Sequence, residues 1–324
     1  MTTPPRVSVV IPLYRSARFL DNISANLEEM PPSVEVLLSD RHGDDDALDR
    51  LEDRHRGDRR LRFLRGADRL DWVEHLNLLL HEARGTYWRF LPHDDRTTGD
   101  ALKALVDCLD AHPDTLLAYG PTRAIDLDGT ALPELDTWQP HPIDNDDPWR
   151  LGLLLDCYAR GHFNGAFKGL VRRAEVLRHH LWIRPTRDSI HAERIWLAAL
   201  GLVGRFRFVP DAVYVKRYYE GSTSSRWRPG IAHELSVRAT FLAYCRARLE
   251  DHLYRRVRAY TTWWTLVRLG VVRPPFDLAS AEPFLPGGPS PAILPRPLAR
   301  LRDDWRALHG AVQGVDGRWD PLGR

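Results

Sequence analysis

Short apolar runs alternate with helix-length segments over the first 120 residues of this chain. The runs cover residues 7–11, 34–38, 61–64, 87–91 and 116–120. A nearly continuous apolar run is typical of a parallel strand that is covered on both faces. The alternation therefore predicts an α/β fold in which helices flank a mostly parallel sheet. In an open sheet of this kind, ligands bind at the carboxyl ends of the strands.

The segments between these runs have the periodicity of amphipathic helices. Leu20, Ile23 and Leu27 recur at helical spacing after the first run. Two further apolar faces consist of Trp72, Leu76, Leu79, Leu80 and Ala83, and of Leu102, Leu105, Val106 and Leu109. Gly85 stands where a helix C-cap is expected. We expect these helices to pack on the sheet.

The remaining chain has a weaker pattern. Residues 126–150 are polar, contain four prolines and have no clean period, which predicts a long loop. Strands are expected at residues 165–171, 206–209 and 213–216, and a helix at residues 192–200. We expect a domain of residues 1–228, with halves that meet at residue 120, and a mainly helical C-terminal extension of residues 229–324.

The extension contains a helical region, residues 233–272, a proline-rich linker, residues 274–297, and a short helix at residues 303–309. The apolar side chains around residues 261–264 have two interpretations. They pack against the main domain, or they form a homodimer or membrane-surface contact. Packing is the favoured interpretation, because most such stripes belong to a core.

The composition excludes some classes of protein. With 46 Lys and Arg against 44 Asp and Glu, the net charge of +2 provides no electrostatic basis for nucleic acid as a partner. Cys108, Cys157 and Cys245 lie far apart, so neither a zinc site nor a disulfide framework is indicated. No run approaches the ~20 apolar residues of a membrane span. We expect a soluble, cytoplasmic protein without a transmembrane segment.

The expected strand at residues 87–91 ends in Pro92-His93-Asp94-Asp95. A strand tip is a rigid place for the oxygen ligands of a divalent cation, and such a cation can neutralise a diphosphate. This predicts sugar-nucleotide chemistry at the two carboxylates. A surface turn is the alternative, because Pro-His-Asp-Asp is also a good turn sequence.

These features together resemble the family-2 glycosyltransferases of the GT-A fold. The resemblance covers roughly residues 7–225 and rests on VSVVIPLY at residues 7–14, SARFL at residues 16–20, Asp40 at the end of the second strand, and ARGTY at residues 83–87. It implies inverting transfer of a sugar from a nucleotide-diphosphate sugar, with a UDP-sugar favoured, to a small-molecule or glycan acceptor. It also implies a divalent metal, Mn²⁺ or Mg²⁺.

On the donor side, the resemblance implies nucleotide binding by Pro12, Leu13, Tyr14, Asp40, Asn77 and Asp94, and a metal site of Asp95, Asp94 and His93. The family's Asp-x-Asp-Asp pattern lacks its first carboxylate here, because Pro92 occupies that position. His93 would add a nitrogen ligand suited to manganese. The alternatives are a hydrogen-bonded turn histidine for His93 and a turn cap for Asp40. Asp44, Asp45 and Asp46 could form a rival metal cluster, but they are expected to begin the next helix, where carboxylates favour the positive end of the helix dipole.

On the acceptor side, the resemblance implies a loop that contains Asn164 and Gly165. It assigns the general base to Glu193, with Asp188 as the second candidate. A surface glutamate in a first helical turn is the alternative for Glu193. Lys216 and Arg217 would steady the diphosphate where many family members have a histidine metal ligand.

Two other functions are consistent with such a sheet. The first is a nucleotide-sugar-binding or scaffold protein that has lost its metal site and does not catalyse transfer. The second is a nucleotidyltransferase, which requires a glycine-rich, lysine-bearing loop after the first strand. The sequence Leu13-Tyr14-Arg15-Ser16 is not such a loop.

Overall fold

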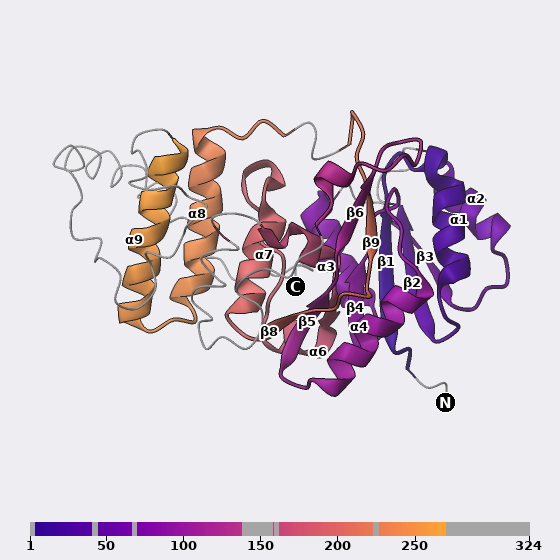
Figure 1. The fold of residues 1–324 in the computed structure, drawn as a ribbon, viewed down its shortest axis with the longest axis horizontal. Helices are drawn as coiled ribbons and strands as arrows, with labels where there is room; N and C mark the ends of the chain where they lie inside the picture. Colours follow the sequence, from indigo (N-terminus) through magenta and orange to yellow (C-terminus); the bar gives the residue numbers. More distant parts are fainter. Residues whose placement is uncertain are drawn as a thin grey trace.

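The computed structural model describes residues 4–40, 45–66, 70–137, 158, 162–222 and 227–269. Its centre is a mixed seven-stranded sheet in the order β3-β2-β1-β4-β7-β5-β8 (Figure 1). The strands are β1 (Val7–Leu13), β2 (Val34–Asp40), β3 (Leu61–Arg65), β4 (Tyr87–Phe90), β5 (Thr115–Tyr119), β7 (Leu170–Arg172) and β8 (Arg205–Phe208). Among them only β7 is antiparallel to its neighbours, β4 and β5. The predicted mostly parallel sheet is confirmed.

Helices cover both faces of the sheet. Because side chains along each strand alternate between the two faces, the strands contribute to two hydrophobic clusters. Val10 and Trp88 belong to one hydrophobic cluster, together with α3 (Trp72–Glu82) and α7 (Ala192–Gly201). Val9 and Ile11 belong to the other, together with α1 (Leu20–Glu29), α2 (Ala47–Arg54) and α4 (Gly99–Ala111). Short helical segments η1 (Ala17–Phe19), η2 (Pro133–Leu135), η3 (His162–Lys168), α6 (Arg173–Arg178) and η4 (Arg187–Ser189) join these elements.

A second, two-stranded sheet pairs β6 (Thr122–Ile125) with β9 (Tyr214–Arg217) in parallel. The β9 strand also forms a bridge to Arg96, just beyond the tip of β4. The Arg96 amide donates to the Val215 carbonyl, and the Val215 amide donates to the Arg96 carbonyl. This bridge brings residues that are more than a hundred positions apart next to Asp94 and Asp95.

The C-terminal part of the described chain forms two helices, α8 (Ile231–Arg246) and α9 (Asp251–Arg268), which stand beside α7 (Figure 1). Phe241 and Val257 are fully buried in the same cluster as Trp196 of α7. Trp264 packs against that cluster, which confirms the packing interpretation for α9. The hydrophobic core therefore continues across the expected domain boundary at residue 228. Among the described helices, none is long and apolar enough to cross a membrane.

Three local predictions differ from the structure. Residues 165–171 were expected to form one strand, but η3 occupies most of this segment and β7 begins only at Leu170. The helical region expected at residues 233–272 is interrupted between α8 and α9. Gly85 is not a C-cap: a Cβ there would lie 2.5 Å from the Ser8 amide nitrogen of β1, so glycine is required by close backbone approach. The linker at residues 274–297 and the helix at residues 303–309 lie outside the described residues.

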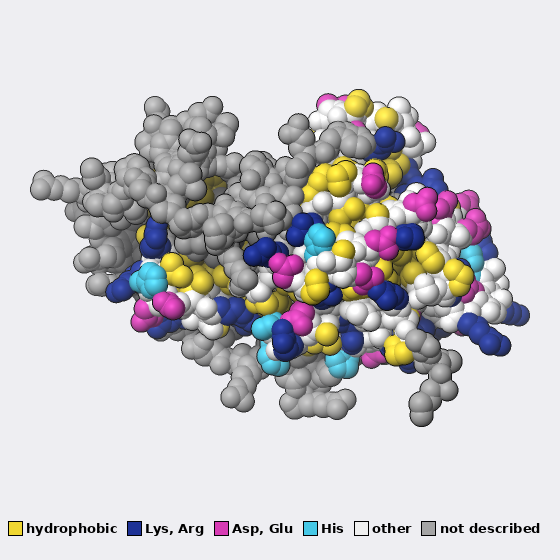
Figure 2. Space-filling model, turned by 60° about the horizontal axis from the view of Figure 1, so that its bottom comes forward, with side chains coloured by type: hydrophobic (Ala, Val, Ile, Leu, Met, Phe, Trp, Pro, Cys, Tyr) yellow, Lys and Arg dark blue, Asp and Glu magenta, His cyan; other side chains and the backbone are white. Residues whose placement is uncertain are grey.

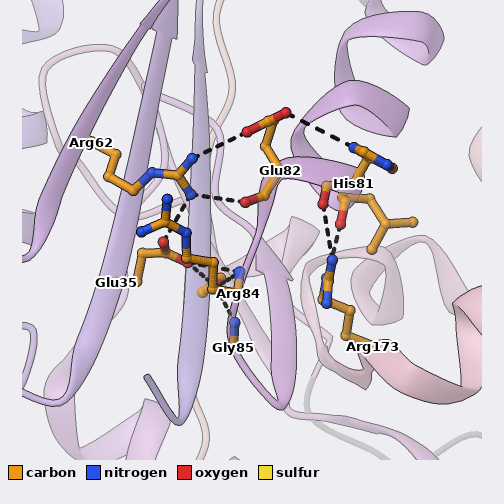
Figure 3. Close-up of polar contacts among 9 residues, drawn as sticks. Glu35, Arg62, His81, Glu82, Arg84, Gly85 and Arg173 are labelled. Carbon is orange, nitrogen blue, oxygen red and sulfur yellow. Dashed lines mark hydrogen bonds and ion pairs between the residues drawn. The ribbon is translucent and has the colours of Figure 1, made fainter. Parts of the chain in front are cut away.

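A buried polar network closes the amino-terminal end of the sheet (Figure 3). Glu35 accepts from Ser8 Oγ at 2.5 Å, from Arg62 at 2.9 Å and from the Arg84 amide at 3.0 Å. Arg62 also donates to Glu82 at the end of α3. This network lies at the opposite end of the strands from Asp40 and Asp94, so its role is structural.

The surface carries charges of both signs. On the described part of the face in Figure 2, basic, acidic and hydrophobic side chains are interspersed, and no single basic surface stands out. This distribution agrees with the small net charge.

Candidate functional site

Parallel strands bring three predicted donor-side segments to one edge of the sheet. Leu13 of β1 is paired with Asp40 of β2, and β4 lies on the other side of β1 with Asp94 beyond its end. Pro12 and Leu13 end β1, and Tyr14, which follows them, is 40% exposed. The expected convergence of strand ends is therefore present.

Asp95 is a buried carboxylate that is tied to β9. Its Oδ1 accepts from the Arg217 amide at 2.8 Å, and its Oδ2 accepts from the Tyr214 hydroxyl. Its carbonyl accepts from Asn22 and Asn26 of α1, each at 2.9 Å. Burial raises the pKa of Asp95, and the charge of Asp94 adds to this effect. These bonds are typical of a residue that fixes a turn. Asp95 as a whole is 3% exposed.

Asp94 is the more accessible of the two carboxylates. Its Oδ2 accepts from the Tyr219 hydroxyl at 2.9 Å, and its carbonyl accepts from Arg217 Nε at 3.1 Å. The guanidinium of Arg18 lies over the Tyr219 ring at 4.7 Å. Asp94 is thus tied to Arg217 of β9 and to Tyr219 in the segment after β9.

His93 is held by the protein. Its Nδ1 lies 3.4 Å from the Pro12 carbonyl oxygen, its ring lies 5.1 Å from the Phe19 ring, and its carbonyl accepts from Asn22. Burial lowers the pKa of His93. These contacts match the turn-histidine alternative. Within the described residues no group of three or more His, Cys, Asp or Glu is placed to hold a metal ion. The predicted trio therefore does not form a metal site from protein ligands alone.

Lys168 enters the site because β7 is antiparallel. Leu170 pairs with Arg89 near the carboxyl end of β4, so Lys168 lies beside that end. Its Nζ lies 3.8 Å from the centroid of Phe90 and 4.9 Å from that of Phe167. Burial lowers the pKa of Lys168, and the charges of Asp95, Lys216, Asp94 and Glu193 also act on it. Sequence reasoning missed this residue because it placed Lys168 inside a strand.

Glu193 lies in the first turn of α7, as predicted, and its side chain is 13% exposed. Its Oε2 is buried and has no hydrogen-bond partner within the described structure. Burial raises its pKa, whereas Arg194, Lys168 and Lys216 lower it. Because buried polar atoms normally have a hydrogen-bond partner, the unpaired Oε2 of Glu193 needs an explanation. A hydroxyl donor from a bound acceptor would provide one.

The segment before α7 has an unusual backbone. Asp188, Ser189 and His191 all have positive φ, between 52° and 62°, although none is glycine. The segment is fixed to α3: Ser189 Oγ donates to Asp71 Oδ2 at 2.5 Å, and Asn77 bonds to both the amide and the carbonyl of Ile183. Strained residues that the surroundings hold in place are typical of functional sites. Here they orient the start of α7.

Several predicted residues have other partners. Asp188 is 68% exposed and lies 2.8 Å from His233 of α8. Asn77 is buried, donates to the Ile183 carbonyl and accepts from the Ile183 amide, so in this structure its amide joins α3 to Ile183. The guanidinium of Arg217 donates to the carbonyls of Asp94, Asp126 and Leu127, which makes it a brace for the site rather than a free cation.

The remaining predicted residues lie near these elements. Lys216 is in β9, with its Nζ 4.4 Å from the Tyr218 ring centroid. Gly165 is in η3, where a Cβ would come within 3.0 Å of Thr122 Oγ1. The side chain of Asn164 lies outside the described residues. Asp45 accepts from the amides of Ala17 and Ala47, so it joins η1 to the start of α2 as a helix-start residue; Asp44 lies outside the described residues.

Comparisons with known proteins agree with this geometry. Residues 8–172 match the family described as Glycosyl transferase family 2. An uncharacterized glycosyltransferase of Haemophilus influenzae is 24% identical over 237 residues, which cover 69% of each chain. Among solved structures, S. aureus TarS 1–349 in complex with UDP-GlcNAc superposes with a TM-score of 0.62 at 15% identity, covering 81% of this chain and 72% of that one. The mannosyltransferase PcManGT from Pyrobaculum calidifontis, in complex with GDP-Man and Mn²⁺, has a TM-score of 0.52 at 18% identity, covering 95% and 81%.

Proposed function

This chain belongs to glycosyl transferase family 2 and has the GT-A fold, and on that premise we propose that it moves a sugar from a nucleotide-diphosphate donor to an acceptor hydroxyl with inversion at the anomeric carbon. The observation that carries the proposal is Glu193, a buried carboxylate with an unpaired oxygen whose charge interacts with Lys168 and Lys216. A UDP-sugar is the favoured donor, and the complex of TarS with UDP-GlcNAc supports this choice.

In this proposal Glu193 acts as the general base. Its carboxylate accepts the proton of the acceptor hydroxyl, and the oxygen attacks the anomeric carbon from the face opposite the diphosphate. The bond from that carbon to the diphosphate oxygen breaks, and its electron pair leaves with the diphosphate. Lys168 and Lys216 help to keep Glu193 ionised, since both lower its pKa.

The donor lies along the carboxyl ends of β1, β2 and β4 in this proposal. In this proposal Asp40, which pairs with Leu13 at the end of β2, accepts a hydrogen bond from the base, and Pro12, Leu13 and Tyr14 contact the nucleotide at the end of β1. Asp94 is the acidic residue nearest the diphosphate. A Mn²⁺ or Mg²⁺ ion would find only this accessible carboxylate in the predicted trio, so no step of the reaction is assigned to a cation.

Calorimetric titration with UDP, GDP and ADP, each with Mn²⁺ and with EDTA, tests donor binding. We expect UDP to bind most tightly, and we expect Asp94→Asn to weaken it. The matched control is Asp107→Asn, an exposed position on α4. If no nucleoside diphosphate binds in either buffer, the proposed function is wrong.

The hydrogen bonds that hold the carboxylate of Asp95 favour a second function, the binding of nucleotide sugars without transfer. A protein that binds nucleotide sugars without transferring them would also keep this residue as a structural tie. Incubation with a panel of nucleotide sugars separates the two functions. Slow donor hydrolysis that depends on Glu193 supports the enzyme, whereas binding without any turnover supports the second function.

A further inference from the structure

Lys168 is held firmly at the carboxyl end of β4. Its carbonyl accepts from Arg89 Nε at 2.9 Å, and Arg89 is itself fully buried and donates to Thr97 Oγ1 at 2.9 Å. The ammonium rests against the rings of Phe90 and Phe167. Lys168 is partly buried, and taking an ammonium out of water is costly unless an opposite charge compensates it. The position of Lys168 therefore calls for an anionic partner.

Lys216 approaches the same place from β9. The bridge between Val215 and Arg96 fixes this strand beside the turn that carries Asp94. The positive charge of Lys216 acts on Lys168, and both act on Glu193. Within the described structure, neither lysine forms an ion pair with a carboxylate. The Asp95 oxygens accept from the Tyr214 hydroxyl and the Arg217 amide, and within the described structure they make no direct bond to either lysine.

One explanation accounts for two observations: the two lysines near Glu193, and the lack of three metal-binding side chains grouped together among the described residues. From their geometry we propose that Lys168 and Lys216 bind the diphosphate of the nucleotide-sugar donor directly and provide the positive charge that stabilises it as it leaves. The inference rests on the proposed function, and it makes donor binding independent of a divalent cation. Lysine and divalent cations both stabilise charge that develops on a leaving diphosphate. The charges of Lys216, Asp94 and Glu193 act on Lys168, and the charges of both lysines act on Glu193.

The test is calorimetric titration of the full chain with UDP, inorganic pyrophosphate and uridine in a buffer that contains EDTA. We expect the wild type to bind UDP and pyrophosphate without a metal. Lys168→Met and Lys216→Met keep the aliphatic stem on its aromatic neighbour but remove the charge. Each should weaken UDP and pyrophosphate about tenfold or more, the loss expected from one charge-assisted hydrogen bond, and leave uridine unchanged. Lys103→Met, at an exposed ion pair on α4, is the matched control.

The outcomes separate this inference from the proposed function. If UDP binds only with Mn²⁺, or if both lysine variants stay within twofold of the wild type in EDTA, the inference is wrong and the glycosyltransferase proposal stands. If no nucleoside diphosphate binds in either buffer, both are wrong. A melting temperature near that of the wild type shows that each variant is folded. The rate of donor hydrolysis by Lys168→Met then measures how far the loss of this charge slows the departure of the diphosphate.

Discussion

Burial distinguishes two acidic residues that lie five positions apart. Glu193 is nearly enclosed and has an unpaired oxygen, whereas Asp188 is exposed and interacts with His233. Both residues were candidates for the general base from sequence alone. Exposure and pairing favour Glu193, because a general base needs a free oxygen that faces the reacting group.

Glu193→Gln tests this assignment. Glutamine keeps the shape of the side chain but cannot accept a proton, so turnover should fall roughly 100-fold or more while UDP affinity stays nearly unchanged. Steady-state kinetics of donor consumption and calorimetric titration measure the two quantities. Asp188→Asn is the matched control, and we expect it to retain turnover within a few-fold of the wild type. A Glu193→Gln variant with near wild-type turnover would place the base elsewhere.

His191 provides a second prediction at the residue scale. Burial, and to a smaller extent nearby positive charges, first that of Arg194, together lower its pKa from 6.5 to about 4. The unfolded chain therefore takes up this proton first as the pH falls. The contribution to stability is full above pH 6.5 and is lost between pH 6.5 and 4, with about 2 kcal/mol lost at pH 5.

His191→Asn should remove this pH dependence, because asparagine does not titrate and tolerates the left-handed backbone at φ 62°. Urea unfolding at pH 7.5 and pH 5.0 gives the difference in unfolding free energy for each variant. His180→Asn is the control, since His180 is exposed and also has a positive φ of 50°. An equal pH dependence in wild type and His191→Asn would contradict the assignment.

At the scale of elements, the sheet separates structural and functional polar groups between its two ends. The network of Glu35, Arg62 and Glu82 joins β2, β3 and α3 at the amino-terminal end (Figure 3). The carboxyl ends carry Asp40, Asp94 and Lys168. Substitutions at the amino-terminal end of the sheet should therefore lower stability and leave ligand binding intact.

Glu35→Gln should lower the free energy of unfolding by about 3 kcal/mol, because it removes the buried carboxylate that pairs with the partly buried guanidinium of Arg62 and leaves Arg62 with Glu82 alone. Chemical denaturation measures the loss, and UDP affinity of the folded variant should stay at the wild-type value. Glu52→Gln, which removes an exposed pair with Arg65, should cost less than about 1 kcal/mol. A loss of UDP affinity in Glu35→Gln would show that the two ends are coupled.

At the scale of the whole molecule, the C-terminal helices share the core of the sheet domain. Phe241 of α8 is fully buried and stacks on Tyr158 with ring centroids 4.5 Å apart. Its cluster includes Val10 at the centre of the sheet and Trp196 of α7. One continuous core favours a single cooperative unfolding transition across residue 228.

The divisions at residues 120 and 228, the homodimer and the cytoplasmic location stay predictions.

Phe241→Ala should lower the free energy of unfolding of the whole described core by about 3–5 kcal/mol, the usual range for a buried phenylalanine. Tryptophan fluorescence and far-ultraviolet circular dichroism should report the same shifted midpoint. Ile231→Ala on the same helix is the control, since Ile231 is 62% exposed. Two separate transitions would show that α8 and α9 unfold independently of the sheet.

Local patterns predicted much of the fold. The strands β1, β2, β3, β4 and β5 and the helices between them follow from runs and periods that span a few residues, because strands and amphipathic helices repeat every 2 and 3.6 residues. The ends of these strands placed Asp40 and Asp94 on the same edge. The position of Glu193 at the start of α7 also followed from local pattern and from the resemblance to the family.

Only the tertiary structure decided which of these side chains are accessible. Asp95 is enclosed because Tyr214 and Arg217 reach it from β9, and Asn77 is occupied because Ile183 lies against α3. Lys168 reaches the site because β7 runs antiparallel between β4 and β5. The sequence determined where strands and helices form, because those depend on neighbouring residues. The partners of each polar group depend on contacts across more than a hundred residues, and no local period encodes them.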